Sequence, residues 1–300
     1  MKKPVFITLP SISLRRENNV LLVKNKNSVI AKFPISVVDS IFVLGNVNIH
    51  TSLVKFLSIN NISVFIMSSS GKVYSTISNE IISSNYRLRL NQYKAFTNKD
   101  IKLQIAKFII EEKRKEIENV FKINLKSYKR KINLTKSIDK LLGIEGYISN
   151  LMFAKFQENL KNSEFEFKGR NYNPPKDPIN VLLSFSYSIF YNLLFCKISE
   201  KGYDPYISFL HVKRGTHRAF VSDVMEVARP ELTKFVMDFI LSGKITIDDF
   251  TSINNRISFK KEKSKDFILE YMKFIESKNL MKSTIEFLKR MEMEFFRNFD

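Results

Sequence analysis

The histidines are the first candidates for catalytic or metal-binding groups, because the sequence contains only His50, His211 and His217. Two carboxylates follow His211 along the chain, at Asp223 and Glu226. On a helix, acids three residues apart lie on the same side. An imidazole followed by such a pair indicates a candidate site for a divalent metal ion.

The other two histidines fit this role less well. His50 follows the apolar Ile49 at a predicted junction between a strand and a helix, which favours a structural role. His217 lies in the basic segment 214–218, which could contact phosphate or could equally lie at the surface.

Glu145 is a second unusual carboxylate. Leu141, Glu145, Ile148 and Met152 follow the spacing of a core-facing helical stripe, so an acid stands where an apolar side chain belongs. A buried carboxylate needs a base, a hydrogen-bond network or a metal ion as its partner. The spacing therefore leaves two interpretations open, an arginine pair or a metal site with His211 and Glu226.

A purely structural interpretation also exists for the downstream acids. Phe220, Val224 and Val227 form the apolar arc of the predicted helix, and Asp223 and Glu226 fall outside that arc. On this interpretation both acids are exposed on the helix surface.

The first 80 or so residues read as strands. Short β-branched or aromatic runs alternate there with turn-forming residues, at 5–9, 20–23, 29–33, 41–44, 64–67 and 73–77. Residues 51–60 break the pattern with helical spacing and offer Thr51 as an N-cap. The sequence predicts a small β-rich domain over residues 1–85.

From about Tyr86 onward the hydrophobic period changes to that of helices. Amphipathic helices are predicted near 134–160, 178–200, 217–242, 262–277 and 279–297, besides those from Leu88 to Phe121. The predicted fold class is α+β, with the β-rich domain followed by a larger all-helical domain over residues 86–300.

The stretch from Pro178 to Cys196 carries no charge and approaches the length of a membrane span. It also contains Asn180, Asn192 and several serines, which are expensive to place in lipid and ordinary in a buried helix. We therefore expect a core helix and no membrane association. Cys196 is the single cysteine, which excludes an internal disulfide, and a cytoplasmic location is the default.

The charge balance points to an acidic polymer as the partner. The 300 residues include 49 Lys and Arg against 30 Asp and Glu, a formal net charge of +19. Residues 113–140 are the most basic segment, which fits either a DNA-backbone contact or a solvated helix face. With 44% apolar and 26% charged residues, a disordered or fibrous chain is excluded.

Four motifs together resemble the CRISPR-associated adaptation integrase, the nuclease-integrase family that inserts new spacers into CRISPR arrays. The motifs occur in the family's order and read LLGIEG at 141–146, DPINVLLSFSY at 177–187, GYDPYISFLH at 202–211 and DVMEVARP at 223–230. The family patterns they are similar to are L-x-G-x-E-G, D-P-x-N-x-L-L-N-Y-G-Y, G-x-D-P-x-x-G-F-L-H and D-L-M-E-x-x-R-P. Together with the β-then-helical order, the resemblance covers essentially the whole chain.

The sequence departs from these patterns at a few positions. Ser184, Phe185 and Ser186 replace Asn-Tyr-Gly, and Ser208 replaces a common glycine. The loop at 212–220 lacks the prolines often found there, although the spacing from the histidine to the last acid is kept.

The resemblance implies that Glu145, His211 and Glu226 are the catalytic metal ligands and that Asp223 is an auxiliary carboxylate. Two carboxylates with one imidazole suit Mg²⁺ or Mn²⁺. Such an ion would support attack of a DNA 3′-hydroxyl on a phosphodiester, or hydrolysis when water attacks instead. No nucleotide-binding loop of the GxxxxGK[ST] type is present, and this exchange of phosphodiesters needs no ATP.

The resemblance also implies partners. These are double-stranded and branched DNA, a second copy of the chain bound through the β-rich domain, and a small ferredoxin-like adaptation protein. Arg214 and Arg218 beside the metal loop are the candidate DNA-binding residues. Three alternatives stay open: a structure-specific DNA nuclease, a transposon-borne integrase of the same family, and a non-catalytic DNA-binding scaffold.

Overall fold

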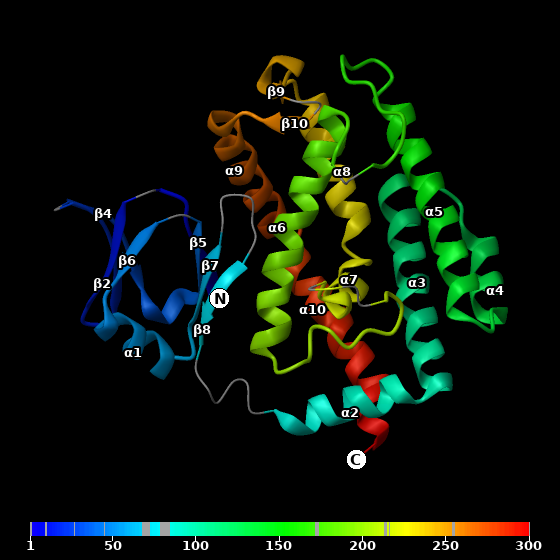
Figure 1. Cartoon of the computed structure of the whole chain (residues 1–300), viewed down its shortest axis with the longest axis horizontal. Coiled ribbons are helices and arrows are strands. Elements are labelled where there is room, and N and C mark those ends of the chain that lie inside the picture. Colours follow the sequence, from blue (N-terminus) through cyan, green and yellow to red (C-terminus); the bar gives the residue numbers. More distant parts are fainter. Residues whose placement is uncertain are drawn as a thin grey trace. The chain divides into compact units, whose positions relative to one another are not determined.

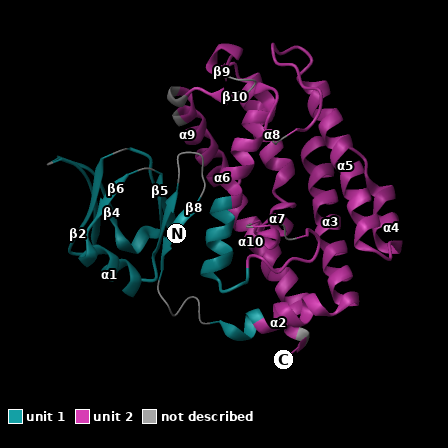
Figure 2. Cartoon of the chain, viewed as in Figure 1, with its two compact units in different colours: residues 1–89, 192–204 teal, residues 90–191, 205–300 magenta. Residues whose placement is uncertain are grey.

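A computed structural model of the chain is shown in Figure 1 and describes residues 2–9, 11–26, 28–44, 46–67, 73–78, 85–171, 174–212, 215, 217–253 and 256–299. Contacts divide the chain into two units (Figure 2). The first unit comprises residues 1–89 and 192–204, and the second comprises residues 90–191 and 205–300.

The first unit contains two four-stranded sheets. One has the order β1-β5-β7-β8, in which only the last pair is antiparallel. The other has the order β4-β3-β2-β6, in which only β2 and β6 are parallel. The bounds are β1 Lys3–Ile7, β2 Ile12–Glu17, β3 Val20–Asn25, β4 Ser28–Pro34, β5 Val38–Leu44, β6 Val47–Ile49, β7 Ser63–Met67 and β8 Val73–Ile77, with a short 3₁₀ turn at Ile35–Val37.

Alternating side chains of the two sheets form the core of this unit. In β2, Ile12 and Leu14 are fully buried, whereas the charged end of the strand from Arg15 to Glu17 is exposed. The helix α1 (Thr51–Ile59) adds its apolar face to the same core. The sequence offered Thr51 as the N-cap of this helix, but His50 is the N-cap and Thr51 is the first helical residue.

The second unit is built from helices that begin and end at ordinary signals. Asn98 caps α3 by accepting from two backbone N–H groups, and Ser137 caps α5 in the same way with one. The helices after the β-rich region are α2 Tyr86–Thr97, α3 Lys99–Phe121, α4 Lys126–Leu134, α5 Ile138–Asn159, α6 Pro178–Glu200, α7 Ala219–Met225, α8 Arg229–Leu241, α9 Lys261–Ser277 and α10 Leu280–Met291, followed by short helical turns to Phe299. Two of them are shared with the first unit, which takes α2 up to Arg89 and α6 from Asn192 onward.

Two findings correct the expected helix pattern of this unit. A hairpin of β9 (Phe250–Ile253) and β10 (Arg256–Phe259) lies between α8 and α9, so the unit is not all-helical. The single helix expected near 217–242 is divided into α7 and α8, and Pro230 stands in the first turn of the second helix, where its missing N–H is tolerated.

The apolar helix α6 is the one described helix that is long and apolar enough to cross a membrane. Of its most apolar window, 67% is buried within the protein. Its polar residues have partners, since the Asn180 side chain accepts from Arg170 and donates to Asp177. This burial agrees with the interpretation of α6 as a core helix.

Three helices of the second unit form the frame for the candidate site. The long helix α3 packs against both α5 and α8 (Figure 1). Buried apolar residues at Ile105, Ile109 and Ile117 recur every four or eight positions along α3 and mark its core-facing side. Charged residues on that same side must therefore find partners on the neighbouring helices.

Candidate functional site

Lys113 of α3 is the charged residue that connects the neighbouring helices. Its side chain is 3% exposed, and its ammonium group donates to Glu145 of α5 and, at 2.5 Å, to Oε2 of Glu226. Glu226 directly follows α7 and precedes α8. Two carboxylates that are 81 residues apart in sequence thus converge on one positively charged atom.

The charged partner of Glu145 is a residue of α3. The acid does stand on a partly buried face of α5, with 19% of its side chain exposed, but its charged partner is a lysine and not an arginine. Ser149, one helical turn further on, donates a second hydrogen bond of 2.7 Å to the same carboxylate. The Glu145 carboxylate is therefore fixed from two sides.

The second oxygen of Glu226 faces two further nitrogen atoms. Oε1 accepts from Nε of Arg229 at 2.7 Å and lies 3.7 Å from Nε2 of His211. Burial alone would raise the pKa of Glu226, but the charges of Arg229, Lys113 and His211 outweigh burial and lower the pKa to about 2. The carboxylate is therefore ionised over the whole physiological range.

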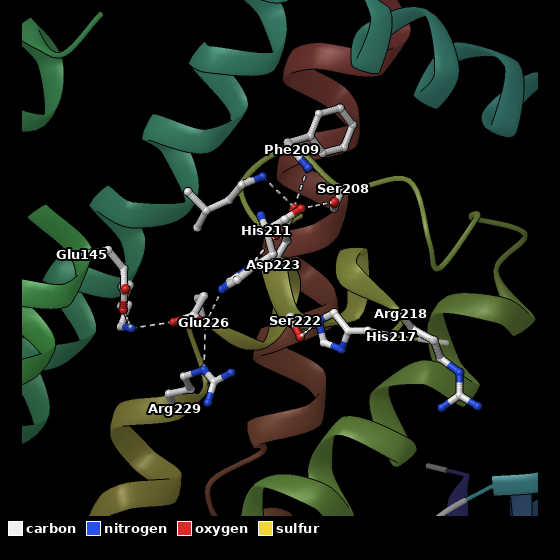
Figure 3. A network of polar contacts seen from close by, with 12 residues as sticks. Glu145, Ser208, Phe209, His211, His217, Arg218, Ser222, Asp223, Glu226 and Arg229 are labelled. Carbon is white, nitrogen blue, oxygen red and sulfur yellow. Dashed lines mark hydrogen bonds and ion pairs between the residues drawn. The ribbon is translucent and has the colours of Figure 1, made fainter. Parts of the chain in front are cut away.

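Asp223 holds His211 in place (Figure 3). Its Oδ2 accepts from the backbone N–H groups of Phe209 and Leu210 at 2.6 and 3.0 Å. Its Oδ1 accepts from the backbone N–H of His211 at 2.9 Å and lies 2.8 Å from the ring atom Nδ1. The Asp223 carboxylate therefore lies against the backbone of residues 209–211 and against the Nδ1 side of the His211 ring. Nε2 is on the opposite side of the ring.

This contact also determines which ring nitrogen of His211 is available. A carboxylate only accepts hydrogen bonds, so Nδ1 carries the proton and the neutral ring has its lone pair on Nε2, which faces Glu226. Burial lowers the pKa of His211, but the hydrogen bond with Asp223 and the charge of Glu226 outweigh burial and raise it. The arrangement suits a residue that binds a cation or moves a proton at Nε2.

The downstream acids are not on an exposed helix surface. Asp223 is 0% exposed and Glu226 is 2% exposed, and every residue of α7 is buried. The helical-wheel arc predicted exposure because it assigned one face of α7 to solvent, whereas the protein encloses this short helix on all sides. The structural alternative of exposed acids is therefore wrong.

A cavity of about 720 Å³ opens beside these residues and lies within the second unit. The acid site forms one part of its lining, and aromatic and basic side chains form others. The lining residues that bear on chemistry are Lys113, Glu145, Ser149, Arg170, Ser184, Tyr187, Tyr191, His211, His217, Ser222, Glu226 and Arg229. Such a volume admits a substituted phosphate together with part of a nucleotide.

The structure describes only one of the two arginines that are expected to bind DNA. Arg214 lies outside the described residues. The backbone of Arg218 exchanges hydrogen bonds with the Tyr191 hydroxyl, at 2.9 Å from its N–H and 3.2 Å to its carbonyl. In Figure 3 the Arg218 guanidinium points away from Glu226.

The sequence reasoning missed Lys113, Arg170 and Arg229. Lys113 shows the same signal that identified Glu145, a charge on an apolar stripe, here between Ile109 and Ile117. Arg170 and Arg229 have weaker signals in the sequence. A single arginine after a glycine, or before a proline, has many interpretations. Arg170 donates to Asn180 and Ser184, which holds it at the cavity.

The described residues contain no group of three His, Cys, Asp or Glu side chains arranged to hold a metal ion. The donor chemistry nevertheless fits Mg²⁺ or Mn²⁺, because Glu145, Glu226 and Nε2 of His211 offer two hard oxygen ligands and an imidazole. The two carboxylates also converge on one cation, the ammonium of Lys113. The side chains therefore fit a divalent metal ion in two respects, the type of their donor atoms and the meeting of two carboxylates at one cation.

A model of the protein family described as CRISPR associated protein Cas1 matches residues 5–273 of the chain. A CRISPR-associated exonuclease Cas4/endonuclease Cas1 fusion of Leptospira interrogans is 31% identical over 81% of this chain, which spans 49% of that longer protein. A CRISPR-associated endonuclease Cas1 of Thermodesulfovibrio yellowstonii is 28% identical, over 82% of each chain.

Solved structures share the fold. A Cas1 protein from Thermotoga maritima has a TM-score of 0.79 at 22% identity, covering 97% of this chain and 96% of that one. A casposase bound to its integration product has a TM-score of 0.74 at 22% identity, covering 92% and 83% of the two chains. A partial Cas6-RT-Cas1–Cas2 complex contains a chain with a TM-score of 0.74 at 20% identity, covering 99% and 98%. The match of the family model over most of the sequence shows that the chain belongs to the family of CRISPR associated protein Cas1.

Proposed function

We propose that the chain is a divalent-metal-dependent DNA integrase and endonuclease that inserts DNA fragments into a CRISPR array. Membership of the Cas1 family supports this assignment, and the relatives are named as endonucleases. A casposase of the same fold was solved with its integration product. The observation that carries the proposal is the convergence of Glu145 and Glu226 beside Nε2 of His211, at the wall of a cavity.

Glu145, His211 and Glu226 would hold Mg²⁺ or Mn²⁺. When bound, the ion supplies polarisation of a phosphoryl oxygen and orientation of the attacking hydroxyl. In the reaction, a DNA 3′-oxygen forms a bond to phosphorus, the bond from phosphorus to the displaced deoxyribose oxygen breaks, and one proton passes from the attacking to the leaving oxygen. One phosphodiester is exchanged for another, so the reaction needs no nucleotide cofactor.

The other residues of the site have supporting roles. Asp223 keeps the His211 ring in the tautomer whose Nε2 is available. Arg229 fixes the Glu226 carboxylate through Nε. Arg170 and Arg229 both lie at the cavity, where guanidinium groups suit the phosphates of a bound strand.

A strand-joining assay tests the proposal. A fragment with a free 3′-hydroxyl is incubated with supercoiled plasmid, with and without Mn²⁺. Glu145→Ala, His211→Ala and Glu226→Ala should each abolish joining and leave DNA binding largely intact. His50→Ala changes an exposed histidine of the first unit and serves as the control. Joining at the wild-type rate by all three site variants would refute the assignment.

Hydrolysis of branched or single-stranded DNA is the second candidate activity, because the relatives are named as endonucleases. Water would replace the 3′-hydroxyl at the same site. The two activities are separated by the products, since joining gives plasmid carrying the labelled fragment and hydrolysis gives only nicked or linear plasmid.

The assembly is also a proposal. The solved Cas6-RT-Cas1–Cas2 complex has a chain of this fold, which supports a Cas2-like protein as the partner, expected to be small and ferredoxin-like. We further propose that two copies of the chain associate through the β-rich first unit. Light scattering of the chain alone and mixed with such a partner would measure both associations.

A further inference from the structure

The ammonium of Lys113 occupies the point on which the acids of the site converge. Glu145 Oε1 and Glu226 Oε2 come from different helical segments and both accept a hydrogen bond from this one nitrogen. Arg229 and His211, the other nitrogen-bearing residues beside Glu226, both face its Oε1, and among the contacts of the described residues neither of them pairs with Glu145. Lys113 is thus the group that bridges the two carboxylates.

A lysine at this position is expensive for the fold. Its residue is 2% exposed, and its neighbours on the same side of α3, Ile109 and Ile117, are fully buried. Its ammonium group stands between the carboxylates of Glu145 and Glu226 and donates a hydrogen bond to each. The positive charge between the buried Glu226 and the partly buried Glu145 keeps the two acids from repelling each other.

We propose that Lys113 is a built-in substitute cation, and that a divalent ion binds by displacing its ammonium group from Glu145 and Glu226. This inference rests on the metal dependence of the proposed function. The two cations exclude each other, because an ion bound to both carboxylates would stand in the place of Nζ and would repel its charge at close range. Only one of them can bridge the acids at a time.

The displaced side chain has a place to go. Lys113 lines the cavity of about 720 Å³, and four single bonds allow its ammonium to turn from the carboxylates into that space. There it would lie on the same cavity as Arg170 and Arg229, where the phosphates of DNA are expected to bind. The exchange would convert Lys113 from an acid partner into a phosphate contact.

The exchange has a measurable consequence for metal affinity. A site that is free of its substitute cation for only a fraction of the time binds metal with an apparent affinity reduced by that fraction. Removing the charge of Lys113 should therefore tighten Mn²⁺ binding, whereas an ordinary structural lysine would leave it unchanged. Loss of a ligand would weaken it.

The experiment measures Mn²⁺ binding by isothermal titration calorimetry for wild type, Lys113→Met, Lys113→Arg and Lys115→Met. Lys115 is the matched control, because it lies on the same helix but pairs with a different acid. Its ammonium is 2.6 Å from Glu112. Lys113→Met should bind Mn²⁺ at least about tenfold more tightly than wild type, which corresponds to a site that is free for a tenth of the time or less. Lys113→Arg, which keeps the charge and pairs more firmly with carboxylates, should bind no more tightly than wild type.

Thermal unfolding adds a second readout that does not depend on activity. Without metal, Lys113→Met leaves the buried Glu226 and the partly buried Glu145 without their bridge and should lower the unfolding midpoint by about 5–10 °C. Saturating Mn²⁺ should restore most of this loss, so the gain on adding metal is larger in the variant than in wild type. If the variant fails to fold without metal, recovery of the fold with Mn²⁺ supports the exchange and failure to recover overturns it.

The outcomes separate this inference from the proposed function. Mn²⁺ binding to wild type with unchanged or weaker binding to Lys113→Met overturns the exchange and leaves the metal site standing. Tighter binding to Lys113→Arg than to wild type also overturns it. No Mn²⁺ binding to any of the variants overturns both the exchange and the metal dependence.

Discussion

Two cavities of the second unit are lined by carboxylates, two in one and four in the other, and the surroundings of these charges differ. The candidate site has Glu145 and Glu226 at a cavity of about 720 Å³. The second cavity, of about 340 Å³, is lined by glutamates of α3, α8 and α10, namely Glu112, Glu116, Glu231 and Glu286, and by Lys278 and Arg290. Lys113 and Glu112 are neighbours in sequence on different sides of α3.

The acids of the candidate site share cations. Glu226 contacts Lys113, Arg229 and His211, and its pKa is lowered to about 2 in spite of burial. In the second cavity, Oε2 of Glu231 is buried with no hydrogen-bond partner among the described residues. Burial, followed by the charges of Glu231 and Glu112, raises the pKa of Glu116.

The difference shows that a group of acids is not in itself an ion site. In the candidate site, carboxylates from separate segments point at one cation, so their charge is balanced and can be transferred to another cation. In the second cavity, Glu112 pairs with Lys115 and with Arg290 of the same lining, and among the ion pairs of the described residues no cation joins two of these acids. The predictions below test this contrast between the two cavities.

The largest expected effect comes from Glu226→Ala in the candidate site, and Glu231→Ala in the second cavity is its counterpart. Glu226→Ala would leave Lys113 and Arg229 as buried charges without their shared partner, which should lower the free energy of unfolding by about 3–5 kcal/mol. Glu231→Ala removes a carboxylate whose nearest ammonium is 3.8 Å away, so its cost should stay below about 1 kcal/mol. Urea denaturation of both variants measures the difference, and equal losses would remove the distinction between the cavities.

Metal binding should distinguish the cavities next. At Mn²⁺ a hundredfold above its dissociation constant, the free energy of unfolding should rise by about 2.7 kcal/mol. Glu145→Ala should lose this gain, whereas Glu112→Ala should keep it, because Glu112 belongs to the second cavity. Thermal unfolding with and without Mn²⁺ measures both. A gain that disappears with Glu112→Ala would place the ion in the other cavity.

Asp223→Asn probes how the candidate site is held. An amide has only one acceptor oxygen and cannot serve both the Phe209–Leu210 backbone and the N–H groups of His211, so about 2 kcal/mol of stability should be lost. The pKa of His211 should fall at the same time, because the Asp223 carboxylate helps to raise it. Urea denaturation and an NMR titration of the ring measure these effects.

Asp238→Asn is the control for that prediction. Asp238 pairs with Lys234 on α8 and half of its side chain is exposed. The control should change stability by less than about 0.5 kcal/mol and should leave the His211 titration unchanged. A His211 pKa that stays the same in Asp223→Asn would show that Asp223 does not tune the ring.

The helical parts of the fold were largely predictable because periodicity is a local property. The 3.6-residue pattern predicted α6 and the change from strands to helices near Tyr86. The strand β2 was not predicted, because only Ile12 and Leu14 of its residues are apolar and buried, whereas its end from Arg15 to Glu17 is charged and exposed. The antiparallel strands β9 and β10 were not predicted, because they are short and lie between helices in the sequence.

The site was predictable where a residue contradicts its own helix pattern. Glu145 was found because it interrupts an apolar stripe, and Lys113 could have been found by the same argument applied to α3. The burial of Asp223 and Glu226 was not predictable, because it depends on which segments enclose α7 and not on the spacing within it. Convergence of Glu145 and Glu226 on Lys113 is likewise set by the packing of α3 against α5 and α8.

Glu116→Gln should give the smallest effect, and with the opposite sign. Burial and the charges of Glu231 and Glu112 raise the pKa of Glu116 above 4.5, although Arg290 and Lys115 oppose them. The folded state then binds the proton more tightly than the unfolded state. The stability of the wild type therefore falls as the pH rises from 4.5 through the higher pKa of the folded state. Removing the charge should stabilise the protein by about 0.5 kcal/mol at pH 7, a figure discounted for solvent screening of this partly exposed group.

The pH dependence of this gain separates relief of repulsion from a simple gain in packing. As the pH falls below 4.5, the wild-type carboxyl becomes protonated in both states, so the difference in the free energy of unfolding between wild type and Glu116→Gln should shrink toward zero. Urea denaturation of the two proteins at pH 7 and pH 4 measures the difference. A variant that is less stable at pH 7 would mean that the acids of the second cavity do have a compensating partner, and the contrast with the candidate site would then lie in geometry alone.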